Sequence, residues 1–161
     1  MKTWNDYKET MYIEPVAFEY ARTGLYEETL KEIHNLPSIN EKNAKGHSLL
    51  MLAAYNDHFE LTRALIKRGA DVNSVDNSGN SILMGVAFKG HASIIKELVT
   101  FKADTFYKNP QGQTALDFAY MFGRTEVAEV INKLNLKTHE PIMGFLKSWI
   151  SFSARLVKAK N

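Results

Sequence analysis

Apolar residues occur along this chain in short runs separated by polar segments, and the pattern returns at a constant period. Each unit is marked by a glycine with a leucine four positions later: Gly46 and Leu50, Gly79 and Leu83, Gly112 and Leu116. A second apolar stripe follows at helical spacing: Leu61, Leu65 and Ile66; Ile94, Leu98 and Val99; Val127, Val130 and Ile131. This spacing predicts two helices per unit. The period, which is the spacing between successive repeated glycines, has a length typical of stacked units that share one core and leave one long face exposed.

The expected helix boundaries also recur with this period. Ser48, Ser81 and Thr114 stand just after the repeated glycines, and hydroxyl side chains there predict N-caps of the first helices. Small residues that allow neighbouring helices to approach closely come next: Ala53, Ala54, Val86, Ala87 and Ala119. The first helices are expected to end in the left-handed conformation, at Asp57, Gly90 and Gly123.

These residues resemble the ankyrin repeat family, whose repeat is about 33 residues long. The match is closest in the segment Gly69, Ala70, Asp71, Val72, Asn73, which corresponds to the family's G-A-D-V-N ending. Further matching positions are Ala53, Ala54, His58 and Glu60, then Ala87, Gly90 and His91, and Ala103 with Asp104. One period earlier, a degenerate copy is marked by Ala21, Gly24, Glu27 and Asn40.

The resemblance implies an all-α ankyrin-repeat solenoid of helix–turn–helix units joined by loop or β-hairpin-like fingers. We expect an ankyrin repeat domain over residues 1–140. It would hold a degenerate repeat at about 12–43 and further repeats at about 44–76, 77–109 and 110–135. A basic amphipathic helix is expected to follow at residues 141–161.

The chain departs from the family pattern in three ways. The family's proline is replaced by Leu49, Ile82 and Ala115, and its histidine by Met51, Met84 and Asp117. We expect these changes to remove side-chain hydrogen bonds and to leave stability more dependent on apolar packing. Lys102 stands where the preceding unit has Gly69. A positive φ at a lysine costs on the order of 1 kcal/mol, so the entry to the third unit is expected to be looser.

Catalytic and metal-binding motifs are not apparent in the sequence. The chain has no cysteine, no G-x-S-x-G motif and no histidine pair with metal-ligand spacing, and its repeated glycines are isolated rather than clustered as in phosphate loops. His58 and His91, one period apart, occupy the structural histidine position of the family. Asp71, Asp76 and Asp104 recur at loop positions where aspartate bonds its own backbone. We therefore predict a non-enzymatic protein without cofactor or metal.

Charge and hydropathy narrow the classes of partner. The net charge is +2, but the segment after residue 140 carries Lys147, Arg155, Lys158 and Lys160 with no acidic residue, which leaves −2 on residues 1–140. A slightly acidic body disfavours nucleic-acid binding, which needs a clustered basic surface. The sequence lacks a membrane-spanning apolar run and a secretory signal, so we expect a cytoplasmic protein.

The family resemblance implies that a protein partner binds the concave face, through the ends of the first helices and the finger loops. The candidate helix positions are Tyr55, Asn56, Phe88, Lys89, Met121 and Phe122, and the candidate finger positions are His47, Asn80, Tyr107, Lys108 and Gln113. Aromatic residues offer large contact areas at low entropic cost, which makes Tyr55, Phe88, Phe122 and Tyr107 the expected anchors. The alternative is that several of them only fill space between neighbouring loops.

The C-terminal segment has a separate pattern. After Pro141, apolar residues including Phe145, Trp149, Ile150 and Phe152 fall on one side of a helix, and Lys147, Arg155 and Lys158 fall on the other. Such a helix would cover the last repeat, rest on an anionic membrane surface, or enter a groove on a partner protein; the remaining alternative is that the segment is disordered. The leading hypothesis is a protein-interaction module. The alternative is a regulatory or accessory protein, for example of an enzyme such as a catalase, or a membrane-surface protein acting through this helix.

Overall fold

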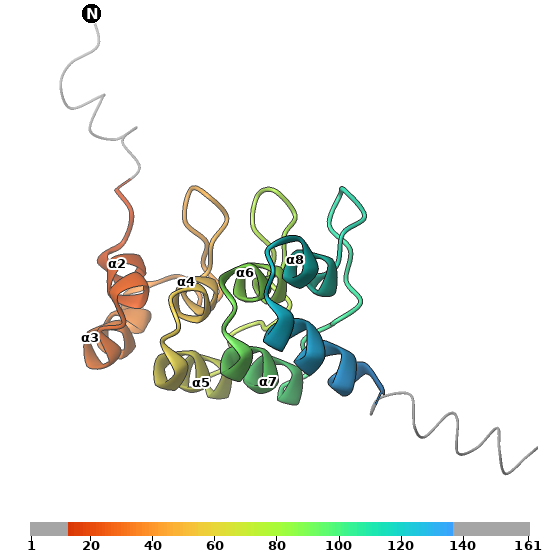
Figure 1. Cartoon of the computed structure of the whole chain (residues 1–161). Helices are drawn as coiled ribbons and strands as arrows, with labels where there is room; N and C mark the ends of the chain where they lie inside the picture. The colour runs from red at the N-terminus through yellow and green to blue at the C-terminus, as the bar shows by residue number, and fades with distance from the viewer. Residues whose placement is uncertain (1–12, 137–161) are drawn as a thin grey trace, which may run out of the picture.

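The computed structural model describes residues 13–136 and shows two layers of helices (Figure 1). The inner layer contains α2 (Val16–Thr23), α4 (Leu49–Tyr55), α6 (Ile82–Lys89) and α8 (Ala115–Met121). The outer layer contains α3 (Tyr26–Glu32) with the short 3-10 helix η1 (Ile33–Asn35), α5 (Phe59–Lys67), α7 (Ala92–Thr100) and a helix over residues 125–136. The predicted all-α solenoid is thereby confirmed. The amphipathic helix predicted at residues 141–161 lies outside the described residues.

The inner helices begin at the predicted caps. The Ser48 hydroxyl accepts a hydrogen bond from the Met51 N–H at 3.2 Å, and Ser81 accepts one from the Met84 N–H at 3.3 Å. Thr114 accepts one from the Asp117 N–H at 3.3 Å. Each bond satisfies one backbone donor that a helix leaves unpaired in its first turn, which fixes where the inner helices start.

One core runs through the described repeats. Each inner helix packs against the next inner helix, and α2, α4 and α6 also pack against the outer helix that follows each of them in sequence. Small side chains such as Ala54 and Ala87 are fully buried and let the helices approach closely. Met51 and Met84, at the family's histidine position, are buried in this core, as expected for a chain that relies on apolar packing.

The third unit has side-chain hydrogen bonds at the family's histidine position, where the sequence predicts their loss. The Asp117 carboxylate accepts hydrogen bonds from both the N–H and the hydroxyl of Thr114, each at 2.7 Å, and completes a capping box. These bonds lower the pKa of Asp117. The aspartate at the family's histidine position therefore makes a local hydrogen-bond network at the start of α8.

Among residues 13–136, two non-glycine residues have left-handed backbones. Asp57 has φ 64° where the next units have Gly90 and Gly123, and Lys102 has φ 71°. Both positions were predicted from the alignment of the repeats. Asp57 follows α4 at the position where Gly90 ends α6, so the sharp turn between inner and outer helices is kept with either residue.

The fingers project from the inner layer as hairpin-like loops (Figure 1). Antiparallel bridges pair Lys42 with Ser48 and Val75 with Ser81. Inside each finger, a side-chain oxygen of Asn43, Asp76 or Asn109 accepts hydrogen bonds from the backbone N–H groups two and four positions later. This repeated side-chain bond explains why short Asn and Asp side chains recur at this position.

Neighbouring repeats are joined by polar contacts at constant offsets. The Nε2 atom of His58 lies 3.0 Å from the Arg22 carbonyl oxygen, and that of His91 lies 3.2 Å from the Tyr55 carbonyl oxygen. In the third unit Arg124 takes the histidine's place and donates from Nε to the Phe88 carbonyl at 2.9 Å. The structural role predicted for His58 and His91 is confirmed.

A second set of contacts joins the repeats beyond the outer helices. The Asn40 side-chain oxygen accepts from the Asp71 N–H, and that of Asn73 accepts from the Asp104 N–H, each at 2.8 Å. Each of these two repeat boundaries therefore carries both kinds of side-chain hydrogen bond, one from a histidine ring and one to an asparagine oxygen.

Candidate functional site

A groove of about 680 Å³ lies between the fingers and the inner helices. Its lining residues come from α2, α4, α6, α8 and the first two fingers, together with Glu14: Glu14, Arg22, Asn43, Ala44, Lys45, His47, Met51, Leu52, Tyr55, Asn56, Asp76, Asn80, Ser81, Ile82, Gly85, Phe88 and Phe118. The groove therefore crosses several repeats, and its volume is within the range of sites that bind small molecules or side chains.

Aromatic rings from successive repeats form a column along the groove. The rings of Tyr55 and Phe88 are nearly parallel, with centroids 6.3 Å apart, and Phe88 meets Phe122 edge to face at 4.5 Å. Phe118 lies 6.1 Å from Phe122. Tyr55 and Phe88 remain partly exposed, and Phe122 is 43% exposed, so the column both packs internally and presents ring surface to solvent.

Lys89 adds a positive charge to this column. Its Nζ atom lies 5.1 Å from the centroid of the Tyr55 ring, which is a cation–π distance. The contact holds the exposed lysine of one repeat over the aromatic residue of the preceding repeat.

The finger side of the groove is polar. His47, Asp76 and Asn80 line it. Burial lowers the pKa of His47, and the nearby positive charges of Lys45 and Arg22 act in the same direction, whereas Asp76 and Glu14 oppose them. The lowered pKa favours the uncharged form of His47, whose ring has one nitrogen that donates and one that accepts a hydrogen bond.

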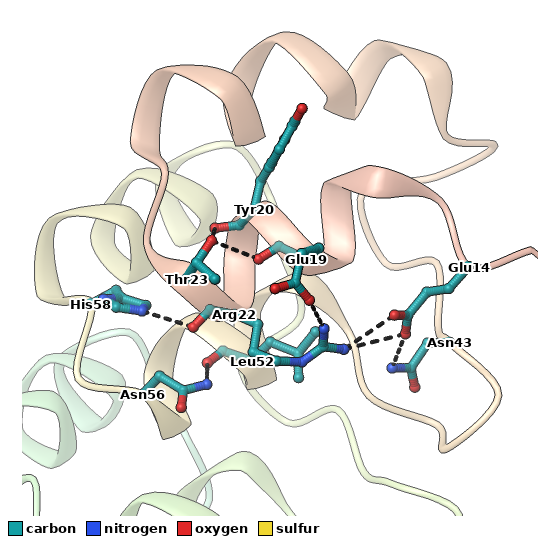
Figure 2. Close-up of polar contacts among 9 residues, drawn as sticks. All are labelled: Glu14, Glu19, Tyr20, Arg22, Thr23, Asn43, Leu52, Asn56 and His58. Atoms are coloured by element: carbon teal, nitrogen blue, oxygen red, sulfur yellow. Dashed lines mark hydrogen bonds and ion pairs between the residues drawn. The ribbon is translucent and has the colours of Figure 1, made fainter.

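The α2 end of the groove carries a charged cluster, shown in Figure 2. Arg22 donates to Glu14 at 3.2 Å and also pairs with Glu19. Asn43, from the first finger, donates to the same Glu14 carboxylate at 2.6 Å. Partial burial acts to lower the pKa of Arg22, but the bonds and charges of the two glutamates outweigh it and raise that pKa. Because two carboxylates share one guanidinium, this cluster has an excess of negative charge.

The structure places the predicted partner-binding residues in two groups. Tyr55, Asn56, Phe88, His47 and Asn80 line the groove. The others lie outside its lining: Lys89, Met121, Phe122, Tyr107, Lys108 and Gln113.

Two of the outlying residues are held in place by neighbouring residues. The Tyr107 hydroxyl donates to the Gly79 carbonyl at 3.0 Å, so this side chain ties the third finger to the second. Gln113 contacts the Met121 sulfur at 3.3 Å and also accepts from Asn109.

Several lining residues were not predicted from the sequence. Leu52, Gly85 and Phe118 occupy one register position, three positions before that of Tyr55, Phe88 and Met121. Side chains at this spacing lie on the same helix face, so the spacing is the signal that could have identified them. The partnership of Glu14 with Arg22 and Asn43 has no comparable signal, because Glu14 precedes the first described helix and is separated from Asn43 by 29 residues.

Neither a cluster of metal-ligating side chains nor a membrane-spanning helix occurs in the described part of the chain. Within residues 13–136, no three His, Asp or Glu side chains are grouped closely enough to hold a metal ion. Over the same residues, every helix is too short or too polar to cross a bilayer.

The two helical layers, the constant offsets between repeats and the projecting fingers define a helical repeat solenoid with a groove on its inner face. A family model described as ankyrin repeats in three copies matches residues 18–109 and, in an overlapping match, residues 50–139. The chain belongs to the ankyrin repeat family, whose repeats serve as protein–protein interaction modules and are generally not enzymes. None of the curated proteins matches the chain.

Proposed function

We propose that this protein is a non-enzymatic module that binds a partner protein in the groove between the inner helices and the fingers. The observation that carries the proposal is the partly exposed aromatic pair Tyr55 and Phe88, which lines a groove whose finger side is polar. Exposed apolar surface bordered by polar groups is typical of protein-binding sites, and aromatic residues are frequent energetic centres of such sites.

The chemistry of the groove also favours binding over catalysis. Its described carboxylates are engaged in structural contacts: Glu14 with Arg22 and Asn43, and Asp76 with the backbone of its own finger. Its histidine, His47, has no nucleophile paired with it among the described hydrogen bonds. The bonds between repeats hold the lining residues in place, which lowers the entropy lost when a partner binds.

Site-specific photocrosslinking tests the proposal. A photoreactive amino acid placed at Asn80 faces the groove, and the same group placed at Ser93, an exposed position on α7, serves as the control. In an extract of the source cell, we expect one protein to crosslink to the Asn80 position and not to the Ser93 position. Equal labelling from both positions would argue against a binding groove.

The double variant Tyr55→Ala and Phe88→Ala tests whether the aromatic pair is needed for partner binding. We expect the Asn80 crosslink to disappear while circular dichroism still shows a folded helical protein. Because both rings also pack within the column, thermal unfolding must be measured in parallel. A crosslink that persists at full yield in a folded double variant would refute the role of the aromatic pair.

A further inference from the structure

Gly85 lies in the interior of α6, where the neighbouring repeats carry Leu52 and Phe118. Its backbone is helical and its φ is not positive, so the main chain does not require glycine. Glycine inside a helix costs about 1 kcal/mol relative to alanine. A β-carbon there would come closest to the Tyr55 ring, 3.3 Å from Cδ2 and 3.9 Å from Cε2. The glycine thus lowers helix stability and lets the Tyr55 ring approach the α6 backbone closely, while no other atom outside the helix's own backbone comes within 4 Å of the β-carbon position.

The space is bordered by apolar side chains from three repeats. Leu52, Tyr55, Phe88 and Phe118 line the groove together with Gly85. We refer to this set of five residues as the Gly85 notch. Leu52 is almost completely buried, while Tyr55, Phe88 and Phe118 are partly exposed. An apolar side chain placed against the backbone of Gly85 would therefore contact one aliphatic and three aromatic neighbours.

The charges beside the notch differ from one end to the other. At the α2 end, Glu14 and Glu19 share the single positive charge of Arg22, and the Glu19 side chain is 56% exposed. At the other end, Lys89 lies over Tyr55 and is exposed. Lys45 of the first finger also lines the groove and balances the charge of the cluster. A basic residue of a bound segment on the α2 side would therefore meet the exposed Glu19 carboxylate in particular.

We propose that the Gly85 notch receives a bulky apolar side chain from an extended segment of a partner protein, and that a basic side chain of the same segment pairs with Glu19. The proposal rests on the proposed binding function and adds the chemistry of the partner. An extended segment can place its backbone against His47 and Asn80 on the finger side while its apolar side chain enters the notch.

Short synthetic peptides provide the probe. Each carries one central residue, either Leu, Met, Phe or Ala, in a Ser/Gln background with a Lys or a Glu on each side, and binding is measured by fluorescence anisotropy. We expect peptides with a large apolar residue and a flanking lysine to bind, and the alanine peptide to bind roughly 10- to 100-fold more weakly. Failure of all apolar peptides to bind, or equal binding of the alanine peptide, would overturn the proposal.

Gly85→Leu fills the notch. Leu52 and Phe118 occupy the same register in the neighbouring repeats, but a β-carbon at position 85 would lie 3.3 Å from Cδ2 of Tyr55, so the partly exposed Tyr55 ring must shift slightly to admit leucine. We expect Gly85→Leu to weaken peptide binding by roughly 10- to 100-fold. Ser93→Leu adds the same side chain to an exposed position of α7 and should bind as the unmodified protein does. Gly85→Ala is the milder second variant, with an intermediate loss, should Gly85→Leu prove unfolded by circular dichroism.

Two further results separate the parts of the proposal. Glu19→Gln should abolish the preference for lysine over glutamate beside the apolar residue; an unchanged preference would refute the pairing with Glu19. If Gly85→Leu binds peptide normally while the Asn80 crosslink depends on Tyr55 and Phe88, the groove binds a partner and the notch is not its anchor. Loss of neither signal in any of these variants would refute the notch and the binding groove together.

Discussion

The Nε2 atom of His91 lies 3.2 Å from the carbonyl oxygen of Tyr55. His58 makes the same contact with Arg22, and Arg124 makes it with Phe88. Arg22, Tyr55 and Phe88 all line the groove. Each of these contacts therefore holds the backbone of a groove residue in the repeat before it, so the bonds that join the repeats also position the lining of the groove.

We predict that His91→Ala lowers the free energy of unfolding by about 1 kcal/mol, because the Tyr55 carbonyl loses its partner. His91→Arg should restore most of the loss, since Arg124 makes the equivalent bond in the next unit. Urea denaturation followed by circular dichroism measures both changes. His34→Ala, at an exposed position on η1, is the control and should be nearly neutral. Equal stability of His91→Ala and the unmodified protein would contradict the role assigned to the contact.

The finger glycines allow a matched comparison. Gly79 and Gly112 have the same φ of 77°, but a β-carbon on Gly79 would lie 2.6 Å from Cδ of Pro110, whereas Gly112 has no atom within 4 Å. Alanine at either position incurs the cost of the left-handed backbone, about 1 kcal/mol. We predict that Gly79→Ala costs at least about 1 kcal/mol more than Gly112→Ala, because the rigid proline ring must move.

Thermal unfolding of the two glycine variants tests this difference. A similar decrease in Tm for both variants would contradict the prediction, because it would show that the second finger can move away from Pro110 of the third finger without further loss of stability. Increased hydrogen exchange at the amides of the third finger in Gly79→Ala alone would show that contact between fingers orders them.

We predict that Lys102→Gly stabilises the protein by about 1 kcal/mol, because a side chain with a β-carbon is unfavourable in the left-handed region. Lys102 has φ 71°, and the preceding repeat has Gly69 at this position with φ 93°. The gain is limited because glycine is more flexible in the unfolded chain. The reciprocal change Gly69→Lys should destabilise the protein, and urea midpoints for the pair provide the measurement. Destabilisation by Lys102→Gly would mean that the lysine side chain contributes more than its backbone strain costs.

We predict that His47 makes stability depend on pH near neutrality. Burial lowers its pKa in the folded protein. In the unfolded chain the pKa of histidine is about 6.5, and between the two values the unfolded state binds more protons, so stability falls as the pH decreases through about 6.5 toward the folded pKa. His47→Asn places at this position the residue that the next finger has at Asn80 and should flatten the slope of the urea midpoint against pH. An NMR titration of His47 that gives an unshifted pKa would contradict the prediction.

The sequence was sufficient for features that depend on local pattern. The caps at Ser48, Ser81 and Thr114, the left-handed Lys102 and the structural histidines follow from residues whose roles recur at the repeat period. The sequence of one repeat alone does not show the role of each residue. Three repeats aligned by their period show which different residues occupy equivalent positions, and therefore the same environment.

The groove was predicted less completely, because it depends on contacts between repeats and on the end of the array. Periodicity alone aligns Met121 with Phe88, yet Phe122 is the residue whose ring meets Phe88. The Met121 sulfur instead contacts Gln113. The cluster of Glu14, Arg22 and Asn43 also breaks the period, because Glu14 precedes the first described helix and its bonds do not recur in the later repeats of the described region.

The constant offset of 36 residues in the contacts of His58, His91 and Arg124 has a consequence for how such a protein can change length. If one full repeat were duplicated in tandem inside the array, both of its new interfaces would pair a side-chain donor with a backbone carbonyl at the same offset as in the original repeats. Lengthening the array by whole repeats therefore creates no new kind of interface between repeats. Each added repeat extends the groove by another inner helix with an aromatic residue and another finger.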